Sequence, residues 1–247
     1  MISSAVILLA ALVGLALGSF CATLAIRMTR REQAILGRSA CDNCGVKLSF
    51  LETAPVVGFA IHRGQCRSCS SGIDPHHLVG EVCGAAIAIT ALWVQPSARG
   101  LAIAGIEFCL LTTAIVDLRT QKLPDIFAIV IASLGVAMAT AQGAVSLISG
   151  IAASGVSIAI LEALRLWGRR SGRPSLMGAG DMKLIGALAL WLGIATPWMV
   201  FGAAAAGLVG VIVMRPKDGK ISFGPFIAIS ASCVGLLCET HVLSVAG

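Results

Sequence analysis

The stretch SSAVILLAALVGLALGSFCATLAI, residues 3–26, decides the fold. It contains no charged residue, and it is long enough for a helix to cross the hydrocarbon core of a bilayer, which takes roughly 20 apolar residues. Its basic residues follow the apolar run, whereas a secretory signal carries them in front. We therefore expect a retained membrane anchor.

The same apolar character extends through the chain. Hydrophobic residues make up 57% of its 247 residues, charged residues only 12%, and tyrosine is absent. This composition excludes an ordinary water-soluble domain. We predict an all-α polytopic integral membrane protein with about eight transmembrane helices, of which the sixth is short. The expected spans are residues 3–26, 79–95, 100–117, 124–141, 145–166, 182–195, 198–214 and 223–241.

These spans divide the chain into three parts. Residues 1–26 form the first transmembrane helix, residues 27–78 a small cytoplasmic loop domain, and residues 79–247 a transmembrane helical bundle. Lysine and arginine collect on the cytoplasmic side of membrane proteins. With eight crossings and the N-terminus outside, every one of the 18 basic residues except Arg99 falls on the inner side. The net charge of +6 then faces anionic membrane lipids, and we expect no nucleic-acid partner.

The loop domain carries two CxxC pairs, CDNC at 41–44 and CRSC at 66–69. Two such pairs, about twenty residues apart, are typical of a structural zinc site in which four thiolates close a tetrahedron. We expect Cys41, Cys44, Cys66 and Cys69 to bind zinc. Redox-active thiols are the alternative, and His76 or His77 could replace one cysteine ligand.

Two acids deserve separate treatment. Asp117 ends the third span in AIVDLRTQKLPD (114–125), and Asp181 opens the sixth in GAGDMKL (178–184), so the topology places both at one level. Asp181 could simply cap a helix, and Asp125 suits a helix start. Asp117 cannot be explained in that way, because a carboxylate is unfavourable at the C-terminus of a helix.

If Asp117 and Asp181 meet, they can share a proton. One carboxyl then acts as general base for water and the other as acid toward a scissile carbonyl, which is peptide hydrolysis of the aspartic type. The sequence leaves open which residue takes which role. Gly178 and Gly180 would let a substrate backbone come close to Asp181.

Several motifs together resemble the type IV prepilin peptidases, which are aspartyl proteases with a GxGD signature. The matching stretches are GSF at 18–20, RGQCRSC at 63–69, LVGE at 78–81, DLRTQKLPD at 117–125, GAGD at 178–181 and FGPF at 223–226. The resemblance implies that Asp117 and Asp181 are the catalytic pair and that Gly178 and Gly180 shape the site. It also implies cleavage of the basic leader of prepilins or pseudopilins, for a pilus or a type II secretion system, at the cytoplasmic face of the bacterial inner membrane.

Members with the four-cysteine loop resemble bifunctional enzymes that also methylate the new N-terminus with S-adenosylmethionine. Glu81 could serve that second activity, bind the basic leader, or complement the start of its helix. The chain departs from the family pattern at CATLAIR (21–27) and at CDNC (41–44). A transporter and a thiol-redox membrane protein are the competing interpretations. The sequence indicates no oligomeric state.

Overall fold

The computed structural model describes residues 3–30, 32, 38–94, 96–171, 177–215 and 221–240. Every regular element in this part of the chain is a helix, which confirms the predicted all-α fold. The chain divides into two compact units, Met1–Trp93 and Val94–Gly247. Some residues that entered the predictions lie outside the described ranges: Arg31, Gln95, Arg173, Lys217, Lys220 and His241.

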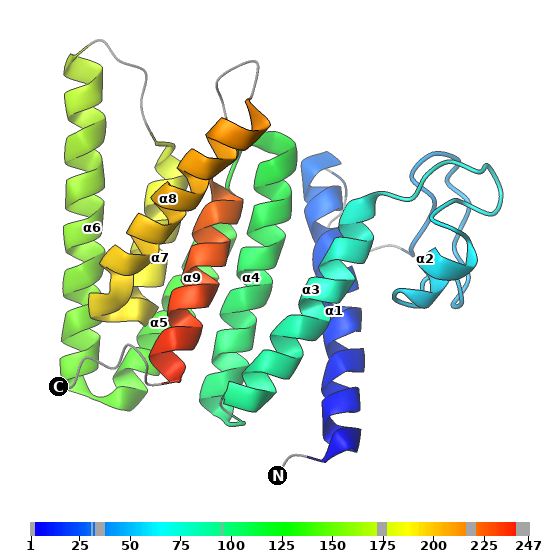
Figure 1. Cartoon of the computed structure of the whole chain (residues 1–247), viewed down its shortest axis with the longest axis horizontal. Helices are drawn as coiled ribbons and strands as arrows, with labels where there is room; N and C mark the ends of the chain where they lie inside the picture. The colour runs from blue at the N-terminus through cyan, green and yellow to red at the C-terminus, as the bar shows by residue number, and fades with distance from the viewer. Residues whose placement is uncertain are drawn as a thin grey trace. The chain divides into compact units, whose positions relative to one another are not determined.

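The first unit contains two long antiparallel helices, α1 (Ser4–Arg30) and α3 (Pro75–Val94), and the short helix α2 (Val57–Ile61) (Figure 1). Glycines line the contact between α1 and α3. A Cβ added to Gly80 would lie 2.8 Å from the carbonyl oxygen of Gly18. Small residues let two helix backbones approach closely, which is how helices commonly associate in membranes.

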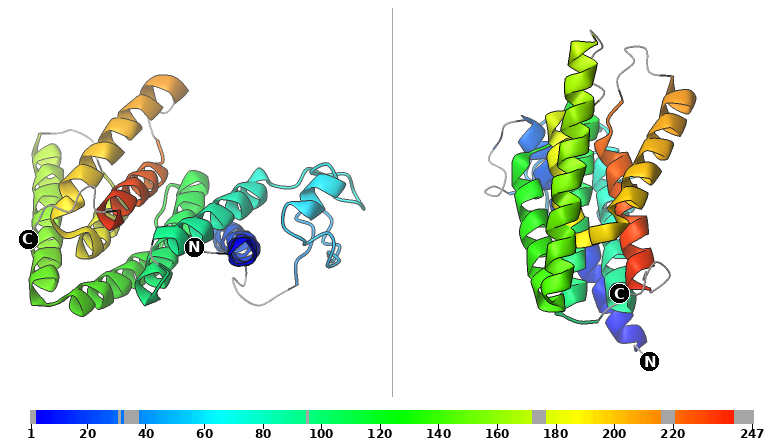
Figure 2. Two further views of the ribbon diagram at one scale, coloured as in Figure 1. Left: turned by 60° about the horizontal axis from the view of Figure 1, so that its bottom comes forward. Right: turned by 90° about the vertical axis from the view of Figure 1, so that its left-hand side faces the viewer.

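The second unit contains six helices and one turn of 3-10 helix. These are α4 (Ala98–Thr120), α5 (Asp125–Gln142), α6 (Ala144–Arg170), α7 (Ala179–Leu192), η1 (Gly193–Ala195), α8 (Thr196–Met214) and α9 (Gly224–Glu239). Successive helices run in opposite directions (Figure 1), and α8 and α9 lie side by side in both views of Figure 2. Consequently the end of α4 and the starts of α5, α7 and α9 lie at one end of this unit.

Helix α7 lies in the core of the second unit. It packs against α5, α6 and α9, and its Leu188 is fully buried. Two neighbouring glycines bring their backbones against it: a Cβ on Gly150 would lie 2.8 Å from the Leu190 carbonyl oxygen, and one on Gly135 would lie 3.0 Å from the Trp191 nitrogen. The neighbouring helices therefore shield this short helix.

The described residues form a helix at each of the eight predicted spans, and these helices differ in length. Six helical stretches of the described residues are long and apolar enough to cross a membrane, and the last of these, Ala179–Met214, includes both the predicted sixth and seventh spans. Helix α9 is shorter. The 14 residues of α7 measure about 21 Å, less than the roughly 30 Å of a hydrocarbon core. Because α7 is enclosed by protein, its own length need not match the bilayer.

Two polar contacts join α4 to α9 away from the candidate active site. The Arg99 guanidinium binds both oxygens of the Glu239 carboxylate at 2.6–3.1 Å, and Glu107 is hydrogen-bonded to the Ser232 hydroxyl. Arg99, the one basic residue predicted to lie outside, is thus paired with a buried acid. These contacts fix the register of the two helices.

Candidate active site and metal centre

Asp117 lies in the last turn of α4, and only 4% of its surface is exposed. The backbone N–H of Gly224, the first residue of α9, donates a hydrogen bond to Asp117 Oδ2 at 2.8 Å. The Ser222 hydroxyl donates to the Asp117 carbonyl oxygen at 2.9 Å. The positive end of α9 therefore faces the Asp117 carboxylate. It compensates for the unfavourable interaction of this carboxylate with the negative end of α4.

Gly224 is a residue of the candidate site that the sequence does not single out by its chemistry. A Cβ at this position would lie 2.9 Å from Asp117 Oδ2 and 3.0 Å from Asp117 Cβ, so only glycine allows the contact. This glycine belongs to FGPF (223–226), a stretch that resembles the family motif but whose sequence alone indicates no role. Its glycine is explained by the close approach of Asp117.

Asp181 is the third residue of α7. Its Oδ2 accepts a hydrogen bond from the backbone N–H of Gly178 at 3.1 Å, so Asp181 does cap its helix. The carboxylate also lies close enough to Asp117 for the two charges to interact. The fold therefore brings both acids to the same end of the second unit, and one of the two is also a helix cap.

The glycines around Asp181 have close neighbours. A Cβ on Gly180 would lie 2.9 Å from the Cβ of Leu123, in the connection between α4 and α5. A Cβ on Gly178 would lie 3.1 Å from Asp181 Oδ2. Gly180 thus lets α7 pack against the segment that follows Asp117, and Gly178 leaves room for the cap.

Asp125, the third acid at this end, pairs with Lys183 of the GAGDMKL stretch. Its two oxygens lie 2.7 and 2.8 Å from Lys183 Nζ, and both side chains are more than half exposed. Exposed ion pairs contribute little to stability. Asp125 therefore forms an ion pair at the surface, which is compatible with the structural role predicted for it at the start of α5.

The four predicted cysteines of the loop form one cluster in the first unit. Their Sγ atoms all lie within 4.8 Å of one another. The Cys41–Cys69 and Cys44–Cys66 pairs have Sγ–Sγ distances of 3.8 and 3.9 Å. A tetrahedral site with Zn–S bonds of about 2.3 Å requires sulfur atoms about 3.8 Å apart, so the cluster fits zinc.

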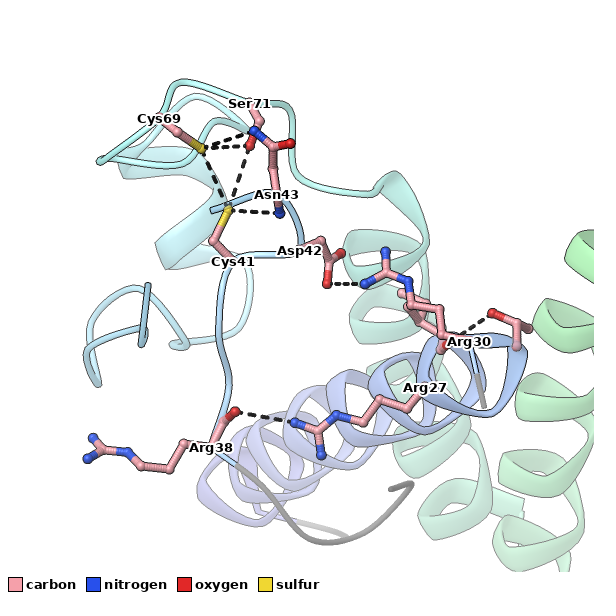
Figure 3. Close-up of polar contacts among 10 residues, drawn as sticks. Arg27, Arg30, Arg38, Cys41, Asp42, Asn43, Cys69 and Ser71 are labelled. Atoms are coloured by element: carbon pink, nitrogen blue, oxygen red, sulfur yellow. Dashed lines mark hydrogen bonds and ion pairs between the residues drawn. The ribbon is translucent and has the colours of Figure 1, made fainter. Parts of the chain in front are cut away.

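Two matching turns present these thiols, and Figure 3 shows one thiol from each turn, Cys41 and Cys69. The Gly45 N–H donates to the Cys41 carbonyl oxygen and the Ser70 N–H to the Cys66 carbonyl oxygen, both at 2.9 Å. Gly45 and Ser70 occupy the same position in the two turns, and both have positive φ angles, 70° and 56°. The two CxxC segments therefore adopt one conformation, and each offers two thiols to the same point.

Neighbouring polar groups lower the pKa of Cys41 and Cys69 and so favour their thiolate forms. A hydrogen bond from the Val46 backbone lowers the pKa of Cys44, but desolvation and the neighbouring thiols outweigh it and raise this pKa to about 11. A hydrogen bond with the Ser71 hydroxyl, together with the Ser71 backbone, lowers the pKa of Cys69 to about 6 (Figure 3). The thiolate is the form that binds a metal. Among the described residues, neither His76 nor His77 belongs to the cluster, and His76 Nδ1 lies 2.7 Å from Asp74 instead.

Glu81 lies inside α3 and is 7% exposed. Its carboxylate accepts two hydrogen bonds, from the Ser19 hydroxyl of α1 at 2.8 Å and from the Val56 backbone N–H at 2.7 Å. Glu81 therefore links both helices of the first unit to the loop. It also lines a cavity of about 1130 Å³, to which Arg27 and Cys66 contribute.

Comparison with known proteins gives matches over both units. The family described as "Bacterial Peptidase A24 N-terminal domain" matches residues 12–95, and "Type IV leader peptidase family" matches residues 103–214. No solved structure gives a significant match.

Three curated relatives illustrate the similarity. The "Prepilin leader peptidase/N-methyltransferase" of Neisseria gonorrhoeae is 31% identical over 199 residues, which cover 78% of this chain and 68% of the relative. The protein of that name from Burkholderia pseudomallei (strain K96243) is 34% identical, with 80% and 66% covered. The "Type 4 prepilin-like proteins leader peptide-processing enzyme" of Escherichia coli O78:H11 (strain H10407 / ETEC) is 26% identical, with 78% and 73% covered.

Proposed function

The chain belongs to the type IV leader peptidase family, Peptidase A24, and we propose that it is a membrane aspartic endopeptidase that cleaves the basic leader from prepilins or pseudopilins. The observation that carries the proposal is that Asp117, in the last turn of α4, and Asp181, in the first turn of α7, lie at one end of the second unit, where their charges interact. Aspartic peptidases use a pair of neighbouring carboxyl groups that can share a proton.

Each carboxylate uses Oδ2 to accept a backbone N–H, from Gly224 or from Gly178. These bonds orient the side chains, and we assign the Oδ1 atoms to water and substrate. One carboxylate removes a proton from the attacking water, and the other, carrying the shared proton, donates it to the carbonyl oxygen of the scissile bond. The proton taken from water then goes to the leaving amine as the C–N bond breaks. The other carboxylate recovers its proton from a hydroxyl of the tetrahedral diol, so the pair returns to its starting state.

The substrate class agrees with this location. A prepilin has a basic leader followed by an apolar helix, so its cleavage point lies where a membrane-embedded helix leaves the bilayer. We assign the acid pair to the cytoplasmic face of the bacterial inner membrane and the N-terminus to the periplasm, because this orientation puts every basic residue except Arg99 inside. Gly178 and Gly180 shape the site that receives the chain.

The relatives named prepilin leader peptidase/N-methyltransferase support methylation of the new N-terminus as a second activity. We assign it to the first unit, where the zinc-bound cysteines would hold the loop and Glu81 lines the cavity. S-adenosylmethionine would supply the methyl group. The charged and polar lining, which includes Arg27 and Ser39, suits a ligand that carries charges of both signs.

The test is cleavage of a prepilin by membranes that contain the wild type, Asp117→Asn or Asp181→Asn at equal expression. We expect cleavage to disappear in both variants, because asparagine cannot take up a proton in this role. Asp125→Asn is the matched control, since it changes an acid at the same end of the unit, and it should cleave normally. Full cleavage by Asp117→Asn or Asp181→Asn would refute the mechanism.

A further inference from the structure

We propose that residues 50–61 of the loop form a lipid-binding element, which inserts apolar side chains between acyl chains of the leaflet next to the four-cysteine loop. This inference concerns the first unit alone and goes beyond the peptidase function. It rests on the depth of the segment beside α1 and α3, on its exposed side chains, and on the local hydrogen bonds of its backbone.

The depth follows from the Glu81 contact. Val56 donates its N–H to Glu81, which also binds Ser19. Ser19 lies eleven residues before Arg30, the last residue of α1, which corresponds to about 16 Å along the helix axis. The segment that contains Val56 therefore lies alongside the helices, as Figure 1 shows for α2.

This position lies at membrane depth. The 27 residues of α1 measure about 40 Å, so the helix exceeds a hydrocarbon core of roughly 30 Å by about 10 Å. Arg27 and Arg30 mark the headgroup level at its C-terminal end. Ser19 lies well inside that level, and the segment joined to it by Glu81 reaches the outer part of the hydrocarbon.

The segment exposes large apolar side chains, as this depth requires. The exposed fractions are 88% for Phe50, 66% for Leu51, 51% for Val57 and 60% for Ile61. Val57 and Ile61 are four residues apart and share one face of α2. Facing water, four such side chains within twelve residues would be unfavourable. Facing acyl chains, each is stabilised.

The charges around the segment suit a lipid surface. Lys47 precedes it and Arg63 follows it, and both are exposed. Basic side chains beside an apolar element bind the anionic headgroups of the inner leaflet. The segment therefore has the amphipathic composition of an interfacial anchor.

The backbone of the segment makes local hydrogen bonds, which membrane entry demands. The Thr53 N–H donates to the Ser49 carbonyl oxygen at 3.1 Å, and the Gly58 N–H donates to that of Ala54 at 2.8 Å. Glu52 caps the start by accepting from the Ser49 N–H at 2.8 Å. The Val56 N–H is satisfied by Glu81, although Val56 has the strained φ of 61°.

The test is photo-crosslinking in the full-length protein, reconstituted in phosphatidylethanolamine–phosphatidylglycerol vesicles that contain an alkyne-labelled phosphatidylglycerol. The photoreactive residue p-benzoylphenylalanine replaces Phe50, Val57 or Ile61, and the matched control is the same replacement of Asn43, an exposed residue of a cysteine turn. We expect a severalfold excess of lipid adduct at the three test positions over Asn43.

Adducts with the second unit or with a second copy of the chain would overturn the proposal, and so would lipid labelling no stronger than at Asn43. The zinc content of each variant shows whether its loop is folded. If one variant loses its metal, the other two test positions still allow the comparison with Asn43. The readout does not involve leader cleavage, so its failure and the failure of the proposed peptidase are distinguishable.

Discussion

Gly224 donates its backbone N–H to the Asp117 carboxylate across 2.8 Å, so the first residue of one helix holds a side chain from the last turn of another. The contact joins the positive end of α9 to an acid at the negative end of α4. It satisfies a backbone donor that α9 itself cannot satisfy, and it fixes the orientation of a proposed catalytic group.

Gly224→Ala should lower leader cleavage by about 10- to 100-fold, because small displacements of a catalytic group have effects of this size. The added methyl group would lie 2.9 Å from Asp117 Oδ2 and must push the carboxylate or α9 away. Gly155→Ala is the control, since a Cβ there has no neighbour within 4 Å. Initial cleavage rates at equal expression measure the effect, and unchanged cleavage by Gly224→Ala would show that the contact is dispensable.

Glu81→Gln should loosen the loop without abolishing cleavage. The amide offers one acceptor oxygen where two donors, Ser19 and Val56, now meet two carboxylate oxygens. We expect faster proteolysis of residues 38–74 and loss of methylation, whereas cleavage by the second unit continues. Limited proteolysis and mass spectrometry of the processed N-terminus provide the two readouts. Glu162→Gln, which alters a partly exposed acid of α6, should change neither.

Purified protein should contain about one zinc ion per chain, held by four thiolates. Cys41→Ser should lose the metal and increase the protease sensitivity of the loop, because a structural zinc site contributes directly to folding. Cys233→Ser replaces an exposed cysteine outside the cluster and should retain the zinc. Metal analysis decides the question, and equal zinc content in the two variants would contradict the assignment.

Glu239→Ala should destabilise the second unit by about 1–3 kcal/mol, because it removes the only carboxylate paired with Arg99 among the described residues. The double variant Arg99→Ala/Glu239→Ala should be less destabilised than Glu239→Ala alone, since it removes the uncompensated charge as well. Thermal unfolding in detergent measures both. A double variant that is less stable than either single variant would exclude this explanation.

Much of the fold was predictable because each helix that crosses a membrane requires a continuous run of apolar residues, which is visible in the sequence. Apolar runs predicted a helix at each of the eight expected spans, and the paired cysteines predicted a cluster whose geometry fits zinc. Hydropathy alone did not predict that α7 is enclosed by its neighbours, because it cannot distinguish a helix that faces lipid from one that faces protein.

The site was predictable only in part, because its orienting groups belong to the backbone. Side-chain chemistry singled out Asp117 and Asp181, but no residue type reveals that the Gly224 N–H reaches across more than a hundred positions of the chain. The hydrogen-bond partners of Glu81 could not be predicted for the same reason, since one of them is the backbone N–H of Val56. The glycines of the sequence are the signal that could have indicated these contacts. Glycine also occurs where two helices pack closely, however, so its presence does not identify a site residue.

The two cysteine turns repeat each other, so the metal site has an approximate internal twofold symmetry in which each half supplies one pair of thiols. Neither half can close a tetrahedron alone, and the chain between Cys44 and Cys66, which includes Phe50 and Ile61, becomes a ring once the ion joins them. Metal supply would therefore govern how well residues 50–61 are held for lipid binding as well as whether the loop is folded.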